Sequence, residues 1–285
     1  MTNESSGEHD QGSLAERARR FRALHDGPHP LLLPCAWDPG SARVLASLGF
    51  EALGTTSGGV NWSAGRPDYV YRTSRWGMLA AYGRIASSVD LPVSADLENG
   101  YGTGPDEVAA TILASIDEGM VGGSIEDRSS EPEPQLLPVE AAAERIEAAR
   151  AAADTSGIVF TLTARAESYF AGIDEPFTDA LLRANRYVAA GADCIFVPGP
   201  ADLDTIARLV AEVGAPVSVG IGSGGRDLTL PALADVGVRR VSTGGALPRA
   251  LYRLLETAGR EMREQGTFDF TADLISETAI NDLFT

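Results

Sequence analysis

Short apolar segments alternate with longer amphipathic segments along the chain from residue 31 onward. Eight of the short segments are typical of strands. Some of them, such as residues 194–197, are apolar throughout, as in a parallel sheet that helices cover on both faces. The predicted strands begin at Leu31, Glu51, Pro92, Gly123, Ile158, Asp193, Pro216 and Arg240.

The amphipathic segments between these strands, such as residues 105–118, 139–153 and 203–213, are typical of helices. Eight strand–helix units follow one another without a Pro- or Ser-rich linker. The pattern therefore predicts a single α/β domain, a (β/α)8 TIM barrel, over residues 14–285, with a disordered segment at 1–13. Glycines suited to helix C-termini follow several of the segments, at Gly49, Gly119, Gly191, Gly214 and Gly237.

Both ends of the chain extend beyond the predicted barrel. A short Arg-rich helix is predicted around residues 14–24, and the chain after Gly259 is acidic and helix-prone. We expect this C-terminal helical extension to pack on a neighbouring subunit of a homo-oligomer.

The charged residues exclude several classes of protein. There are 40 acidic and 23 basic residues, and the resulting net charge of −17 repels nucleic acid and anionic lipid surfaces. All 23 basic residues are arginine, which excludes a Schiff-base aldolase, a pyridoxal-phosphate enzyme and a Walker A loop, because each needs a lysine. The three histidines precede the first predicted strand, so proton transfer must use carboxylates, tyrosine, arginine or water.

The cysteine count and the hydropathy of the chain indicate its compartment. Cys35 and Cys194 are the only cysteines, which is typical of a reducing compartment, and no apolar run approaches the ~20 residues of a membrane span. The sequence predicts a cytoplasmic protein with no membrane partner.

Acidic residues follow two neighbouring predicted strands. Asp96 and Glu98 come at the end of the third strand, where alternation would place them on the same side, and Glu126 and Asp127 end the fourth. Carboxylates gathered at the C-terminal edge of a barrel repel one another unless a cation binds, and oxygen ligands select Mg²⁺ or Mn²⁺. The alternative is that residues 126–128 form surface ion pairs or cap the next helix.

Two further strand ends carry residues suited to binding a carboxylate. The second strand runs into small residues at 55–59, whose backbone N–H groups form either an anion cradle or a tight turn. The fifth strand ends near Arg165, which either clamps a substrate carboxylate or neutralises nearby glutamates.

Taken in order, these motifs resemble the isocitrate lyase/phosphoenolpyruvate mutase superfamily over residues 31 to about 253. The resemblance rests on residues 34–38, 57–59, 65–68, 96–102, 125–127, 164–167 and 239–242. Members of the superfamily are TIM barrels that use Mg²⁺ to hold a 2-oxo acid and stabilise its enolate, and they usually form tetramers that exchange a C-terminal helix. The resemblance implies that Asp96 is the main metal ligand, supported by Asp68, Glu98 and Glu126. It also implies that Arg165 binds the substrate carboxylate and that the oxo-acid head binds at Thr56, Ser57, Gly58 and Gly59.

The chain departs from the family pattern at two places. The loop at 129–138 has no cysteine, lysine or histidine, whereas lyase members carry a Lys-x-Cys-Gly-His stretch there, and Ser218 replaces an asparagine. The departures argue against isocitrate lyase, methylisocitrate lyase and phosphonopyruvate mutase activities.

We therefore predict a Mg²⁺-dependent lyase that acts on a 2-oxo or 2-hydroxy di- or tricarboxylic acid through an enolate. Decarboxylation of an oxaloacetate-like acid and retro-aldol cleavage of a substituted malate both fit this prediction, with Tyr101 or a metal-bound water moving the proton. The alternatives are P–C bond chemistry on phosphonopyruvate or phosphoenolpyruvate, and a protein that has lost catalysis and binds a small acid. The expected assembly is a homotetramer or homodimer.

Overall fold

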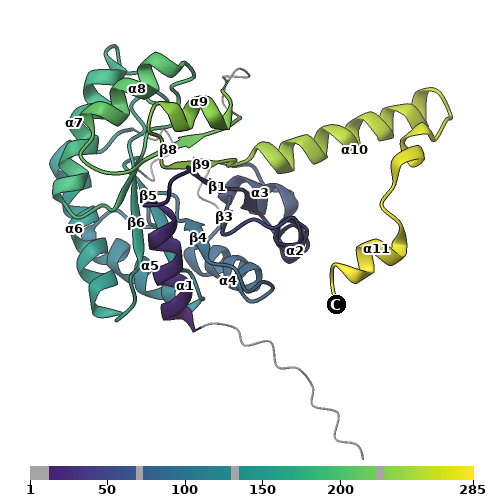
Figure 1. The fold of residues 1–285 in the computed structure, drawn as a ribbon, viewed down its shortest axis with the longest axis horizontal. Coiled ribbons are helices and arrows are strands. Elements are labelled where there is room, and N and C mark those ends of the chain that lie inside the picture. The colour runs from purple at the N-terminus through teal and green to yellow at the C-terminus, as the bar shows by residue number, and fades with distance from the viewer. Residues whose placement is uncertain (1–12, 69–72, 130–134, 223–227) are drawn as a thin grey trace, which may run out of the picture.

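The computed structural model of the chain describes residues 13–68, 73–129, 135–222 and 228–285. Nine short parallel strands form one sheet that curls into a nearly closed barrel, and helices surround it (Figure 1). This arrangement confirms the predicted α/β TIM barrel. The strands are β1 (Leu31–Leu33), β2 (Cys35–Ala36), β3 (Leu53–Thr55), β4 (Val93–Asp96), β5 (Gly122–Glu126), β6 (Thr161–Arg165), β7 (Cys194–Phe196), β8 (Val217–Gly220) and β9 (Arg240–Ser242).

The first predicted strand is divided into β1 and β2 at Pro34. β1 pairs with β9, with Leu31 opposite Arg240, and β2 pairs with β3, with Cys35 opposite Gly54. Proline has no N–H to donate to a ladder, so the strand breaks where it changes partners. The nine segments thus make up the eight strands of the barrel.

The predicted start of the fifth strand, at Ile158, was wrong. β6 begins at Thr161, and the Phe160 N–H bonds to the Ile158 carbonyl in a local turn. The Phe160 side chain is fully buried and lies close to Gly123. Phe160 belongs to the core and Ile158 packs against it, whereas Val159 is exposed; this short apolar run therefore resembles a strand in the sequence.

Helices connect successive strands and cover the outside of the barrel. Three of the predicted helices occur within two residues of their predicted ends, at residues 105–117, 139–155 and 203–212. The helices in the described part of the chain are α1 (Leu14–Leu24), α2 (Pro39–Ser47), α3 (Ser57–Ser63), α4 (Arg75–Ala86), α5 (Pro105–Asp117), α6 (Val139–Thr155), α7 (Pro176–Ala189), α8 (Leu203–Glu212), α9 (Leu230–Asp235), α10 (Ala246–Glu264) and α11 (Glu277–Asp282), with a 3₁₀ turn at Asp269–Asp273.

Helix α1 covers the end of the barrel where the strands begin. Ser13 caps it through a capping box with Glu16, so the prediction of disorder was wrong for Ser13; residues 1–12 lie outside the described part of the chain. Phe21 packs on Gly122, where an added Cβ would come within 2.8 Å of its ring. Arg22 bonds the Thr161 hydroxyl at 3.1 Å, which ties the helix to β6.

Helix α10 extends away from the barrel, and the chain then turns back through the 3₁₀ turn and α11 (Figure 1). Its long apolar side chains are uncovered, with Leu254 at 59% and Leu255 at 65% exposure. The predicted helical extension is therefore present, and its exchange between subunits stays a prediction. No helix in the described ranges combines the length and apolar character needed to cross a membrane.

Candidate active site

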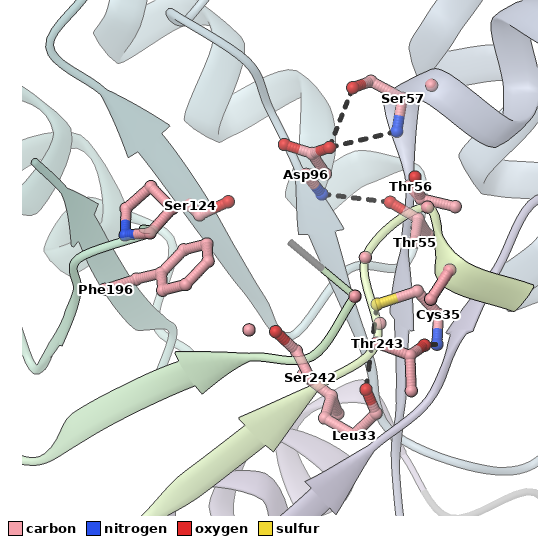
Figure 2. Close-up of a pocket in the computed structure, with 18 of the residues that line it drawn as sticks. Leu33, Cys35, Thr55, Thr56, Ser57, Asp96, Ser124, Phe196, Ser242 and Thr243 are labelled. Carbon is pink, nitrogen blue, oxygen red and sulfur yellow. Dashed lines mark hydrogen bonds between the residues drawn. The ribbon is translucent and has the colours of Figure 1, made fainter. Parts of the chain in front are cut away.

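A cavity of about 340 Å³ opens at the C-terminal ends of the strands, where parallel barrels place their active sites. Figure 2 shows side chains from several strands that converge on it, among them Thr55, Asp96, Phe196 and Ser242. Residues far apart in the sequence meet there because the strand ends lie at one edge.

Asp96, the last residue of β4, is held in a fixed position. Its Oδ2 atom accepts hydrogen bonds from the backbone N–H of Ser57 at 3.0 Å and from the Ser57 hydroxyl at 2.8 Å (Figure 2). The Asp96 N–H donates to Thr55 Oγ1, and the Tyr82 hydroxyl donates to the Asp96 carbonyl. The small residues after β3 were predicted to form either an anion cradle or a tight turn, and in this structure the Ser57 amide binds the Asp96 carboxylate.

Glycines beside Ser57 allow close packing around this carboxylate. A Cβ on Gly58 would come within 2.8 Å of Asp68 Oδ2, and a Cβ on Gly59 would come within 2.7 Å of Trp37 Cβ. A larger residue at Gly58 or Gly59 would therefore clash with these neighbours. The same packing brings Asp68 to the wall of the cavity.

Arg165, at the end of β6, lies among carboxylates from three strand ends. Its Nη1 atom is 3.4 Å from Glu126 Oε2 and 3.9 Å from Asp96 Oδ1, and its Nε pairs with the buried Glu167. The guanidinium also lies 5.4 Å from the centre of the Phe196 ring. Arg165 therefore neutralises acidic side chains, and it remains at the cavity wall where it could bind a substrate carboxylate.

Glu98 is buried near Asp96, in surroundings that disfavour its charged form. Burial, together with the charges of Asp96, Glu126 and Asp68, raises the pKa of Glu98 to about 9. Its φ of 49° and the φ of 57° at Tyr101 are left-handed conformations that cost energy in residues other than glycine. β4 ends at Asp96 and the chain turns before Glu98, so strand alternation does not extend to Glu98, although its carboxylate still interacts with that of Asp96.

The family model described as phosphoenolpyruvate phosphomutase matches residues 21–263. The chain belongs to this family. As the motifs predicted, it is thus a member of the isocitrate lyase/phosphoenolpyruvate mutase superfamily of lyases and mutases, whose enzymes generally depend on a divalent metal.

Its relatives include solved structures and curated enzymes. The crystal structure of a candidate lyase/mutase from Burkholderia cenocepacia J2315 is 45% identical with a TM-score of 0.91, covering 95% of this chain and 96% of that one. A 2-methylisocitrate lyase of Shewanella oneidensis is 32% identical over 208 residues, which are 70% of this chain and 68% of the relative. An oxaloacetate decarboxylase of Pseudomonas savastanoi pv. phaseolicola is 31% identical over 263 residues, 89% of this chain and 87% of the relative.

The predicted site residues of this phosphomutase-family chain divide into two groups. Thr56, Ser57, Gly58, Asp68, Asp96 and Arg165 line the cavity, whereas Gly59, Glu98, Tyr101 and Glu126 are not part of its wall. The hydroxyl of Tyr101 is buried, and burial followed by the neighbouring Tyr82 raises the pKa of Tyr101 well above its usual value.

The carboxylate oxygens at the cavity of this chain are suited to a divalent cation. No group of three or more acidic, histidine or cysteine side chains lies close enough to form a ready metal cage in the ranges that the structure describes. Asp96 and Asp68 nevertheless both border the cavity, and a cation there would relieve the repulsion that, after burial, raises the pKa of Glu98. Carboxylate oxygens without cysteine or histidine suit Mg²⁺ or Mn²⁺.

Sequence reasoning also missed residues of the site. Arg249, in the first turn of α10, lines the cavity and donates to the Gly222 carbonyl at 3.3 Å. A basic residue shortly after the glycine-rich end of the last strand was the available signal. Asp127, in contrast, is structural, since the Tyr187 hydroxyl at 2.7 Å and Arg183 at 3.2 Å hold its buried carboxylate. The ion pair of Asp127 is thus present, but it is buried and not on the surface as the alternative had it.

Proposed function

We propose that this chain is a divalent-cation-dependent lyase that cleaves a C–C bond of a 2-oxo or 2-hydroxy di- or tricarboxylic acid through an enolate. The proposal rests on the position of Asp96. Ser57 holds this carboxylate at a strand end, beside Arg165, on the wall of a cavity of about 340 Å³. A small carboxylic acid fits such a space, and the arginine matches its charge.

Mg²⁺, or Mn²⁺ in its place, would be held by Asp96 with support from Asp68, Glu98 and Glu126. When bound, the cation supplies positive charge that stabilises the developing enolate oxygen. The bent segment after β4 keeps Glu98 close enough to Asp96 for the Asp96 charge to raise the pKa of Glu98, in addition to the effect of burial.

The chain itself would bind and orient the acid. Thr56, Ser57, Gly58 and Gly59 would bind the oxo-acid head at the start of α3. Arg165 would bind the carboxylate through its guanidinium. The ion pairs of Arg165 with Glu126 and Glu167 fix the orientation of this guanidinium before the substrate binds.

Tyr101 or a water molecule is the proposed proton donor. Burial raises the pKa of the Tyr101 phenol, so its hydroxyl stays protonated at neutral pH, and because it lies outside the cavity wall its proton would reach the substrate carbon through a water molecule. The loop at 129–138 offers no cysteine, lysine or histidine for this step, although residues 130–134 lie outside the described part of the chain.

Decarboxylation or retro-aldol cleavage needs no cysteine acid and is therefore the favoured chemistry. The oxaloacetate decarboxylase among the relatives supports the first reaction. The match to the phosphomutase family model keeps P–C chemistry as the second candidate. A protein that only binds a small acid is the third.

The test is NMR of the protein with Mg²⁺ and a mixture of oxaloacetate, methylisocitrate, dimethylmalate, phosphonopyruvate and phosphoenolpyruvate. Asp96→Asn should lower turnover by more than roughly a hundredfold, because a bound cation contributes several kcal/mol. Asp90→Asn, the same change at an exposed position, is the control and should be fully active. Normal turnover by Asp96→Asn would contradict the metal assignment, and no conversion by the parent would favour the binding protein.

We also propose a homo-oligomer in which α10 and the segment after it pack on another subunit. The exposed leucines of α10 support this, because a monomer would leave a long apolar helix face in water.

A further inference from the structure

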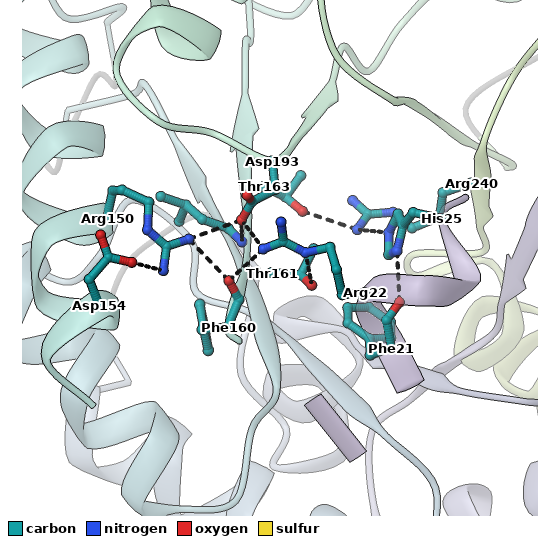
Figure 3. Close-up of polar contacts among 11 residues, drawn as sticks. Phe21, Arg22, His25, Arg150, Asp154, Phe160, Thr161, Thr163, Asp193 and Arg240 are labelled. Carbon is teal, nitrogen blue, oxygen red and sulfur yellow. Dashed lines mark hydrogen bonds and ion pairs between the residues drawn. The ribbon is translucent and has the colours of Figure 1, made fainter. Parts of the chain in front are cut away.

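The barrel interior contains a buried arginine below the proposed catalytic residues. Arg240, on β9, is only 4% exposed. Its Nε donates to Ser218 Oγ at 2.9 Å, and its Nη1 donates to Thr163 Oγ1 at 3.0 Å and lies 3.5 Å from His25 Nε2. Figure 3 shows the guanidinium beside His25, which α1 brings to this end of the barrel.

Each of these partners is uncharged. His25 Nδ1 lies 2.9 Å from the Phe21 carbonyl, so this nitrogen carries the hydrogen and Nε2 presents its lone pair to Arg240. Burial, followed by the charge of Arg240, lowers the pKa of His25 to about 3, which keeps the ring neutral. The partners therefore accept hydrogen bonds from Arg240 without balancing its charge.

Acidic side chains near this end of the barrel are paired with other arginines. The Asp193 carboxylate lies 2.6 Å from Arg22 and 3.0 Å from Arg150 (Figure 3). Among the residues that the structure describes, no carboxylate comes within 4 Å of Arg240. A buried cation without a nearby counter-charge is costly, and proteins normally supply an anion.

The cavity extends down to Arg240, whose side chain forms part of its wall. Ser94, Ser124 and Ser242 also line it, and their hydroxyls make no hydrogen bond to any other residue in the described ranges. Figure 2 shows Ser124 and Ser242 facing the space between the strands. Barrel interiors are usually filled by bulky branched side chains, whereas this one has small polar residues around an open space.

We propose that the inner end of the cavity binds a small monovalent anion, a halide ion or a carboxylate group, against Arg240. The guanidinium supplies one positive charge, and the three serine hydroxyls supply hydrogen-bond donors. Dianions are disfavoured because Asp96 at the mouth adds negative charge to the same cavity. The site needs neither a metal nor turnover, so it stands independently of the proposed function.

Crystals of the full chain grown with sodium bromide test the site directly. We expect an anomalous peak inside the barrel next to the Arg240 guanidinium. The absence of bromide from the cavity of the parent would overturn the proposal, and this result does not depend on whether any variant folds.

Chloride NMR tests the same site in solution. The parent should broaden the ³⁵Cl signal, Arg240→Gln should lose most of the excess linewidth, and Arg240→Lys should keep part of it because it keeps the charge. Arg239→Gln is the matched control, because it removes the same charge from an exposed neighbour and should broaden the signal as the parent does. Circular dichroism confirms that each variant is folded, and equal broadening by folded Arg240→Gln would refute the site.

Acetate distinguishes the two sources of the anion. If acetate at millimolar concentration removes the chloride broadening of the parent, the site accepts carboxylates, and the occupant is an organic acid. If acetate has no effect while bromide competes, the occupant is a halide. Either result supports the site.

Discussion

The stability of the fold should depend on the protonation of His25. This ring is 3% exposed, and burial with the charge of Arg240 lowers its pKa from 6.5 to about 3. Between these values the unfolded chain binds a proton at His25 that the folded chain does not bind. Stability therefore rises with pH in this window and is lost as pH falls below 6.5 toward 3.

The size of the effect follows from the two pKa values. At pH 7.5 protonation of His25 in the unfolded chain changes the free energy of unfolding by close to zero. At pH 5.5, protonation of the unfolded histidine should cost the fold about 1.4 kcal/mol, so the free energy of unfolding should fall by about 1.4 kcal/mol between pH 7.5 and pH 5.5. Lower pH is avoided because the isoelectric point is about 4.5, where the protein would associate.

Urea unfolding of the parent and of His25→Gln at both pH values measures this difference, at one protein concentration. Glutamine keeps a donor and an acceptor but does not titrate, so the parent should lose about 1.4 kcal/mol more stability than the variant between pH 7.5 and 5.5. His29→Gln, at an exposed histidine, should keep the pH dependence of the parent. If His25→Gln and the parent respond to pH in parallel, the buried neutral histidine is not the cause.

Three further outcomes test the site and the assembly. Arg165→Lys should raise KM by roughly 10–100-fold, because it removes a charge-assisted pair of hydrogen bonds to the substrate. Unchanged kcat and KM would show that Arg165 has only a structural role. Mg²⁺ should raise the melting temperature of the parent but not of Asp96→Asn, since only a bound ligand stabilises the fold, and equal responses would contradict the metal site. Removal of the residues after Gly259 should lower the mass measured by light scattering to that of a smaller assembly, and an unchanged subunit number would exclude a role of this segment in assembly.

Local pattern was sufficient to predict most of the fold. The helix at 14–24 and the eight barrel strands follow from periodicity, which depends only on neighbouring residues. The break at Pro34 could not be predicted, because it depends on β1 and β2 having different partners. The start of β6 was misplaced because apolar core residues precede it.

The candidate site was predicted less completely, for reasons of geometry. Asp96 and Arg165 were found because they end strands that form a shared edge. The left-handed turn at Glu98, with a φ of 49°, was not predicted, because no sequence pattern shows this turn. Arg240 and Arg249 were missed because they reach the cavity through contacts between distant parts of the chain.

The pairing of β1 with β9 also affects how the chain is made. Leu31 and Arg240 are roughly 210 residues apart, so at usual rates of translation β1 leaves the ribosome roughly 10–40 s before its partner strand exists. Through that interval the leucine edge of β1 and the open side of the growing sheet are exposed to other nascent chains. Closure of the barrel is therefore necessarily a late event in biogenesis, and the unclosed sheet is the species that chaperones would have to protect from aggregation.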